Sequence, residues 1–298
     1  MQYRGAGGIQ RCSAHVSTEN LTVSLVRLAI LFLCIGLVVS ACNPVVNFFA
    51  FHPDTRYEVP PDRFPADTED VFFEASDGVR LHALHLHHSA ADTVTVYFHG
   101  NAGNVYHRLR DLRHLRDIGT SVLALSYRGY GKSDGSPDEA GLYRDAEAAY
   151  AYATKTLGYQ PSRIFLLGRS LGSTTATELA QGKALAGVIL ISPLSSAADQ
   201  AGAMGLGFAA GLAGNAFDNV SKITRLKAPL LIVHGTFDQV IPIAMGRKVY
   251  EAASGDKTFQ IFEGAGHNNF SSQFARQYWQ AISAFIKQHS ESEPAKKN

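Results

Sequence analysis

Short apolar runs alternate with amphipathic stretches along most of the chain. The runs contain few polar positions, which is typical of strands buried on both faces of a mostly parallel sheet. The first two runs meet at Asp77-Gly78, a dipeptide that favours a tight turn. We expect strands over residues 71–74, 79–81 and onward, 93–98, 122–125, 164–167, 188–191, 230–233 and 258–262.

Helical patterns fill the intervals between these runs. Leucines recur at near-helical spacing at Leu109, Leu112 and Leu115, for example. The predicted helices cover residues 109–118, 138–154, 174–180, 245–253 and 274–289. Strands that alternate with helices predict an α/β fold, here a doubly wound, mostly parallel sheet of about eight strands with helices on both faces.

The alternation lapses between Pro193 and Ala228. Within this interval Ala201–Phe217 carries no charged residue and is rich in glycine, alanine, leucine and phenylalanine. We expect residues 195–219 to form a short cap over a site, a patch that lies against lipid, or a loosely helical connection packed on the sheet. Short apolar runs do not distinguish these structures.

Residues 1–41 differ from the rest of the chain. Leu28–Ala41 is uncharged and almost wholly apolar; it is short for a membrane span, which needs about 20 residues, but suits the core of a secretory signal. Val39-Ser40-Ala41-Cys42 resembles the lipobox of bacterial lipoproteins. We therefore predict an exported protein, lipidated at Cys42 and anchored to a membrane facing the periplasm or the cell surface. The alternative is an uncleaved helical anchor over residues 21–41, with Arg27 reaching toward the interface.

The polar part ahead of this apolar core is long for a signal peptide, and a translation start near Leu21 or Val23 is a further hypothesis. Cys12 and Cys34 lie in the leader, so a chain that starts at Cys42 cannot form an internal disulfide. The formal net charge of +1 gives no reason to expect nucleic acid as a partner. The predicted organisation is a signal or anchor (1–41), a proline-rich tether packing on the body (42–68), an α/β domain (69–289) and a flexible tail (290–298).

Two segments match the pattern G-x-S-x-G, in which the serine is exposed at a sharp strand-to-helix turn. Ser170 lies in Gly168-Arg169-Ser170-Leu171-Gly172, directly after an apolar run and before a helical pattern. Ser133 lies in Gly131-Lys132-Ser133-Asp134-Gly135, where neither a strand nor a helix adjoins it. Ser170 is therefore the candidate nucleophile, and Ser133 is a chance match.

A serine hydroxyl needs a base to take its proton and a third group to orient that base. Asp238 follows the apolar run 230–233, and His267 follows the last predicted strand, which gives the chain order serine, acid, histidine. The oxyanion of a tetrahedral intermediate needs backbone N–H donors. We assign these to Leu171 and to Asn101 in the glycine-rich loop 99–104, with Ala102 as the alternative to Asn101.

These segments together resemble the α/β-hydrolase superfamily over about residues 48–288. The similarity to a compact branch with little lid, including depalmitoylase-like and serine-aminopeptidase-like members, is carried by these segments: Phe51-His52-Pro53, Asp77-Gly78, His99-Gly100-Asn101, Tyr127-Arg128-Gly129-Tyr130-Gly131 and Ser192-Pro193. The resemblance implies Ser170 as nucleophile, His267 as general base and then acid, and Asp238 as the orienting carboxylate.

The sequence therefore predicts a serine hydrolase that cleaves a small carboxylic ester or thioester through an acyl-enzyme, without a cofactor. The alternatives are a serine peptidase of the same fold and a membrane-tethered binding module without turnover. Histidines crowd one predicted strand at His82, His85, His87 and His88, but no acid or cysteine accompanies them, so we expect no metal site. The sequence does not indicate the oligomeric state.

Overall fold

The structure is a computed structural model that describes residues 46–47, 50–56 and 67–290. The residues of the predicted leader, Cys42, most of the predicted tether and the tail from residue 291 lie outside these ranges, and the predictions made for them stay predictions. No helix within the described ranges is long and apolar enough to cross a membrane.

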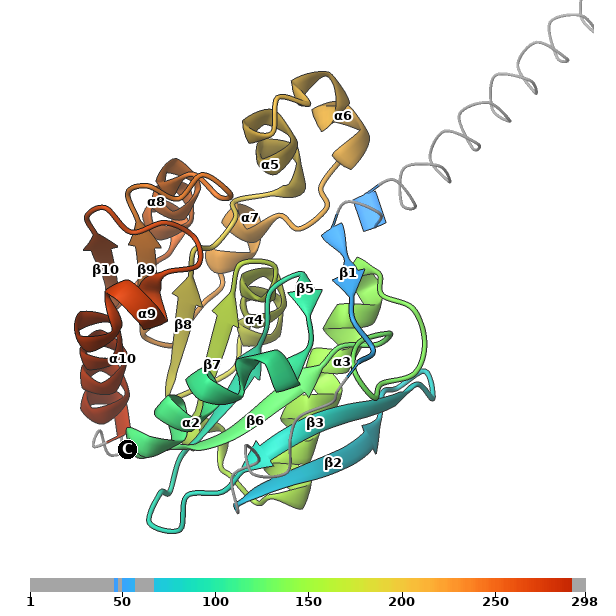
Figure 1. Ribbon diagram of the computed structural model, residues 1–298, viewed down its shortest axis with the longest axis vertical. Helices are drawn as coiled ribbons and strands as arrows, with labels where there is room; N and C mark the ends of the chain where they lie inside the picture. The colour runs from blue at the N-terminus through green and yellow to red at the C-terminus, as the bar shows by residue number, and fades with distance from the viewer. Residues whose placement is uncertain (1–45, 48–49, 57–66, 291–298) are drawn as a thin grey trace, which may run out of the picture. The chain divides into compact units, whose positions relative to one another are not determined.

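Eight strands form one sheet in the order β10-β9-β8-β7-β4-β6-β3-β2 (Figure 1). Strand β3 pairs antiparallel with both β2 and β6, and all the other neighbours are parallel. The predicted fold class and strand number are therefore confirmed. The strands are β2 (Thr68–Glu74), β3 (Arg80–Leu86), β4 (Val94–Phe98), β6 (Ser121–Ser126), β7 (Ile164–Arg169), β8 (Gly187–Ile191), β9 (Leu230–Gly235) and β10 (Lys257–Phe262).

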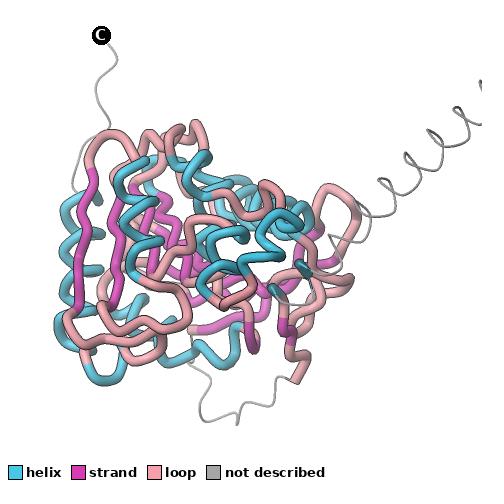
Figure 2. Tube along the Cα trace, turned by 90° about the horizontal axis from the view of Figure 1, so that it is seen from above, coloured by secondary structure: helices cyan, strands magenta, loops and turns pink. Residues whose placement is uncertain are grey.

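Helices cover both faces of this sheet (Figure 2). The longer ones follow the predicted intervals, although α4 begins two residues before the predicted start at Thr174. The helices are α2 (Leu109–Asp117), α3 (Glu139–Ala151), α4 (Gly172–Ala180), α5 (Ala197–Ala203), α6 (Ala210–Ala213), α7 (Asn219–Ile223), α8 (Ile243–Ala252), α9 (Phe270–Gln273) and α10 (Ala275–Ser290). Shorter helical turns are η2 (Val105–Arg108), η3 (Tyr152–Thr156), η4 (Pro161–Arg163) and η5 (Gly207–Ala209).

The core consists of two layers of buried side chains, one on each face of the sheet. Successive side chains of a strand point to opposite faces, so Val96 and Phe98 of β4 pack in one layer while Tyr97 packs in the other. Helices α3, α4, α7 and α8 cover the first layer, and α2, α9 and α10 cover the second. Burial on both sides explains why the strands are continuous apolar runs in the sequence.

The predicted helix over residues 138–154 ends earlier than expected. Asp138 caps its N-terminus, with its side chain accepting a hydrogen bond from the Gly141 N–H, and α3 runs to Ala151. The wider turn η3 follows, with Leu157 N–H donating to the Tyr152 carbonyl. The alanine-rich pattern identified the helix but not this change of winding.

Residues 195–219 contain α5, η5 and α6. Figure 1 shows α5 and α6 beyond the carboxyl ends of β7 and β8, rather than against a face of the sheet. The base of the segment is fixed to the body, because Ala197 N–H donates to the Ala216 carbonyl and Asn219 N–H donates to the Ser195 carbonyl. We call residues 197–216 the helical hairpin.

The N-terminal part of the body also lies at the carboxyl end of the sheet. Strand β1 (His52–Pro53) pairs in parallel with β5 (Ala102–Gly103), which follows β4. Phe51 is buried, and its ring lies edge-on to Phe217 at the base of the helical hairpin, with centroids 6.1 Å apart. This segment is therefore built into the loops at that end.

Candidate active site

Ser170 lies in the tight turn between β7 and α4. Its φ of +54° is left-handed backbone that a side chain rarely adopts. A Cβ on Gly168 would lie 2.4 Å from the Gly172 carbonyl oxygen, and a Cβ on Gly172 would lie 2.1 Å from the Phe98 carbonyl oxygen. Both glycines of the motif are thus required by close backbone contacts, and the turn holds the serine at the end of the sheet.

The structure brings Ser170, His267 and Asp238 together. His267 Nε2 lies 3.1 Å from Ser170 Oγ, and His267 Nδ1 lies 2.8 Å from Asp238 Oδ2. Ser170 follows β7, Asp238 lies in the loop after β9, and His267 lies in the loop after β10. We call this set the Ser170 arrangement.

Asp238 is held in a defined orientation. Its side chain is fully buried, and Oδ1 accepts hydrogen bonds from the backbone N–H groups of Val240 and Ile241 at 3.0 and 2.8 Å. Burial acts to raise the pKa of this carboxyl, but the contact with His267 and the bond from Ile241 outweigh it, so the pKa is lowered. Asp238 is therefore an anion near neutral pH and can accept a hydrogen bond from His267 Nδ1–H.

The loop 99–104 lies beside Ser170. A Cβ on Gly100 would be 3.5 Å from the Ser170 Cβ, an ordinary contact. Within the described ranges, the backbone N–H groups of Asn101 and Leu171 donate to no protein acceptor. Two donors in the loops around the serine are thus uncommitted.

Buried tyrosines fix the carbonyl groups of this loop. The Tyr127 hydroxyl donates to the His99 carbonyl at 3.0 Å, and the Tyr130 hydroxyl donates to the Asn101 carbonyl at 2.8 Å. The His52 N–H also donates to the Asn101 carbonyl, at 2.9 Å. The peptide groups of the loop are therefore oriented before any substrate arrives, as an oxyanion site requires.

The two other histidines near the site are buried and have structural contacts. His99 Nδ1 lies 2.7 Å from the Gly100 carbonyl, so this nitrogen carries the proton, and burial lowers the pKa of His99 to about 3. His234 Nε2 contacts the Ile241 carbonyl at 2.9 Å and lies 3.5 Å from Asp238. Burial also lowers the pKa of His234. Both rings are neutral groups that support the loops.

The sequence analysis did not identify a role for Arg169, which occupies the first unspecified position of the G-x-S-x-G motif. Its guanidinium donates to the His267 carbonyl at 2.9 Å and to the Asn268 side chain at 2.8 Å. It ties the loop that carries His267 to the turn that carries Ser170. No spacing rule identifies this contact, because its partners are almost one hundred residues away in the chain.

Ser133, the chance match, is buried in a loop and bonds to other parts of the molecule. Its hydroxyl accepts a hydrogen bond from the His82 N–H at 2.8 Å and donates to the Ser126 carbonyl at 2.7 Å. The same region contains another serine, histidine and aspartate in a row. Ser126 Oγ lies 3.2 Å from His82 Nδ1, and His82 Nε2 lies 2.7 Å from Asp70. We call this set the Ser126 arrangement.

Among the described residues, no group of three or more His, Cys, Asp or Glu side chains is placed so that it could hold a metal ion. His82 belongs to the Ser126 arrangement, and the His85 and His87 rings are 6.1 Å apart at their centroids. His85 is buried, which lowers its pKa. No cofactor site was predicted, and none is proposed.

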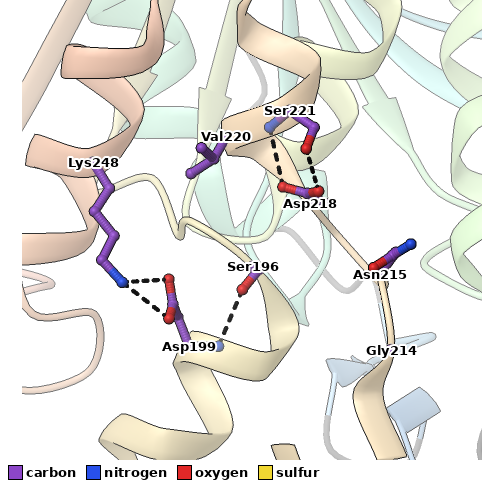
Figure 3. Close-up of a pocket in the computed structure, with 8 residues that line it drawn as sticks. All are labelled: Ser196, Asp199, Gly214, Asn215, Asp218, Val220, Ser221 and Lys248. Atoms are coloured by element: carbon purple, nitrogen blue, oxygen red, sulfur yellow. Dashed lines mark hydrogen bonds and ion pairs between the residues drawn. The ribbon is translucent and has the colours of Figure 1, made fainter. Parts of the chain in front are cut away.

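A pocket of about 370 Å³ lies at the base of the helical hairpin (Figure 3). The Lys248 amine contacts both carboxylate oxygens of Asp199, at 3.0 and 2.9 Å, and joins α8 to α5. The lining consists of Ser196, Asp199, Gly214, Asn215, Asp218, Val220, Ser221 and Lys248. None of these belongs to the Ser170 arrangement, and their polar character is not that of a site for an acyl chain.

A family model described as serine aminopeptidase, S33 (Hydrolase_4) matches residues 89–221 and 204–272, which together are more than half of the chain. The chain belongs to this hydrolase family. The uncharacterised protein Rv2307c of Mycobacterium tuberculosis is 31% identical over 221 residues, 73% of this chain and 78% of that protein. The uncharacterised protein YfhR of Salmonella typhi is 30% identical over 290 residues, 90% of this chain and 96% of that protein.

Solved structures confirm the fold. The Pyrococcus furiosus esterase Pf2001 superposes with a TM-score of 0.69 at 19% identity, covering 81% of this chain and 98% of that protein. An α/β hydrolase from Vibrio vulnificus gives 0.67 at 23% identity, covering 78% and 89%. The resemblance to the α/β-hydrolase superfamily is therefore confirmed, and the protein is a hydrolase of this fold. The narrower depalmitoylase-like branch stays a prediction.

Proposed function

We propose that this protein is a serine hydrolase that cleaves carboxylic esters or thioesters through an acyl-enzyme on Ser170. The observation that carries the proposal is the continuous contact from Ser170 Oγ through His267 to Asp238, beside two uncommitted backbone N–H groups. This combination supplies a nucleophile, a base, an orienting anion and an oxyanion site.

In the proposed first half-reaction, Ser170 Oγ attacks the acyl carbon and His267 Nε2 takes its proton. The negative charge on the former carbonyl oxygen is stabilised by the N–H groups of Asn101 and Leu171. His267 then returns the proton to the departing alcohol or thiol. His267 then takes a proton from water, which attacks the acyl-enzyme, and returns that proton to Ser170 Oγ as the carboxylic acid leaves. Asp238 holds the ring and balances its positive charge.

The test is covalent labelling of the purified protein by a fluorophosphonate probe, with Ser170→Ala and Ser133→Ala as paired variants. We expect labelling of the wild type and of Ser133→Ala, and none of Ser170→Ala. A folded wild type that takes no label would favour the binding module without turnover. If labelling depends on Ser170, hydrolysis of esters and thioesters of increasing chain length defines the preferred acyl group.

A peptidase of the same fold is the second candidate, because the matching family is described as a serine aminopeptidase. Amides have a poorer leaving group than esters, so an esterase should leave amino-acid anilides uncleaved, whereas a peptidase cleaves them at a measurable rate. We expect hydrolysis of esters and none of anilides. Anilide hydrolysis by the wild type that is lost in Ser170→Ala would assign a peptidase.

We also propose that the protein is exported and held at a membrane through Cys42. Several acyl chains on one cysteine would make the attachment stable, because each buried methylene contributes about 0.8 kcal/mol. Metabolic labelling with an alkyne fatty acid should mark the wild type and not Cys42→Ala. Unprocessed protein of full length in the membrane fraction would instead support the helical anchor.

A further inference from the structure

Exposed large apolar side chains are concentrated at the carboxyl end of the sheet. Among the side chains that the structure describes, five large hydrophobics are exposed: Phe72, Met204, Phe208, Phe237 and Val240. Phe208 is the most exposed, at 87%. All except Phe72 lie in the helical hairpin or in the loop after β9, which also carries Asp238. We call these four residues the apolar rim.

The two parts of the apolar rim are joined to each other. The Gln200 side-chain amide of α5 donates to the Val240 carbonyl at 2.9 Å. The Asp199–Lys248 ion pair forms a second link between the hairpin and the helix that follows the β9 loop. The rim is therefore held on the body beside the active-site loops, and it is not a single mobile tip.

The composition of the hairpin favours an apolar partner. Ala201–Phe217 contains no charged residue, and α5 has no fully buried side chain although it is rich in alanine. A surface that recognises a folded protein needs polar groups around its apolar centre to set the orientation. A bilayer interior requires only apolar side chains, and exposed patches of this kind mark such contacts.

The chain length before the body places the membrane within reach of this end. Phe51, which contacts the base of the hairpin, is nine residues after Cys42. Nine residues span at most about 30 Å. If Cys42 carries the lipid anchor, the active-site loops stay within the thickness of one small domain from the bilayer surface.

We infer that the apolar rim inserts into the surface of a phospholipid bilayer, so that the enzyme acts on acyl esters or thioesters embedded in that bilayer. This inference rests on the proposed function and on the proposed anchor, and it names the substrate class of the same site. Long acyl chains would then reach Ser170 from the lipid phase, without a deep pocket in the protein.

The contact is measured with the full-length protein reconstituted in phosphatidylcholine vesicles. Phe208→Trp and the matched control Phe72→Trp are made in a Trp279→Phe background, since Trp279 is the only native tryptophan. We expect brominated phospholipid to quench the introduced indole several-fold more in Phe208→Trp than in Phe72→Trp. Equally weak quenching of both variants would overturn the inference.

The catalytic consequence is measured on two substrates, a short water-soluble ester and a long-chain ester embedded in the vesicles. Phe208→Asp should lower the rate on the embedded ester about tenfold to a hundredfold, the range expected when one buried aromatic is lost. The rate on the soluble ester, and fluorophosphonate labelling, should not change. Phe72→Asp should change neither rate.

The outcomes separate the two proposals. A folded wild type that takes no fluorophosphonate label and hydrolyses neither ester would refute the proposed function itself. Normal activity on the soluble ester, with equal rates on the embedded ester for wild type and Phe208→Asp, would refute only the bilayer contact. A dimer that Phe208→Asp converts to a monomer in light scattering would show that a second copy covers the rim instead.

Discussion

Two rows of serine, histidine and aspartate lie in this molecule with almost the same distances. In the Ser170 arrangement the serine and histidine are 3.1 Å apart and the histidine and aspartate 2.8 Å. In the Ser126 arrangement the corresponding distances are 3.2 and 2.7 Å. The histidine is reversed, since His82 faces its serine with Nδ1 and its acid with Nε2. Distances alone therefore do not separate a candidate active site from a structural network.

The surroundings of the serines differ. Ser126 ends a regular strand, is fully buried, and belongs to a network that also includes Ser133. Ser170 lies on a turn with left-handed backbone and faces a loop with an uncommitted N–H group. Both serines are buried, with 8% of Ser170 and none of Ser126 exposed. Backbone strain and free N–H donors are thus the features that distinguish the candidate nucleophile from the structural serine.

The two aspartates differ in their burial and in the number of their partners. Asp238 is fully buried and contacts His267, whereas Asp70 is partly exposed and contacts Lys132 at 2.8 Å and the Tyr106 hydroxyl. Burial acts to raise the pKa of Asp70, but Lys132, Tyr106 and His82 lower it overall. Asp70 is thus shared among several partners and is not dedicated to one ring.

The largest expected difference between the arrangements is the loss of the serine. Ser170→Ala should lower kcat on a soluble ester by about four to six orders of magnitude, the range found when a triad serine is removed. Ser126→Ala should leave kcat within about twofold, because it removes only a buried hydrogen bond. Steady-state kinetics on folded protein, verified by circular dichroism, checks both. A large loss of kcat in Ser126→Ala would show that the Ser126 arrangement takes part in turnover.

Changing the acids should give the next largest difference. Asp238→Asn should lower kcat about 10⁴-fold, since the amide cannot balance the charge that forms on His267. Asp70→Asn should leave kcat nearly unchanged and lower the free energy of unfolding instead. Paired urea titrations and ester kinetics measure the two effects. Similar kinetic losses in the two variants would show that the Ser126 arrangement contributes to turnover.

The pH dependence of stability should reveal the buried histidine of the Ser126 arrangement. Burial lowers the pKa of His82, more than contact with Asp70 raises it. Below the ordinary imidazole pKa of about 6.5, His82 is therefore protonated in the unfolded chain but still neutral in the folded protein. Its contribution to stability is complete above that pH and falls as the pH is lowered, by at most about 1.4 kcal/mol per unit. His82→Asn should flatten this part of the profile in denaturant titrations from pH 7 to pH 5, and an unchanged profile would contradict it.

The smallest effect concerns backbone strain and should have opposite signs at the two serines. Ser170→Gly removes a side chain from left-handed backbone and should stabilise the fold by about 1 kcal/mol. Ser126→Gly loosens a strand and should destabilise it by about 1 kcal/mol or more. Thermal unfolding of both variants decides the point. A destabilised Ser170→Gly would mean that the turn stores no strain.

The sequence allowed the sheet, its order of strands and helices, and the positions of Ser170, Asp238 and His267 to be predicted. These features depend on local patterns, such as an apolar run followed by small residues and a polar side chain. Arg169, Tyr127 and the Ser126 arrangement could not be predicted, because their contacts join residues far apart in the chain. The form of residues 195–219 stayed open for a related reason, since its apolar residues follow no single period.

The hydrogen bond from His52 to the Asn101 carbonyl has a consequence for how this domain could be shortened or joined to another protein. By composition the domain starts near residue 69, but one of the bonds that orient the loop beside Ser170 comes from residue 52. A fusion protein in which this chain begins at residue 69 would contain all eight strands of the sheet and lose only the first residue of β2. It would lack β1. Such a protein should fold as a hydrolase and, if Ser170 is the nucleophile, turn over slowly, because the segment before residue 69 helps to orient the loop beside Ser170.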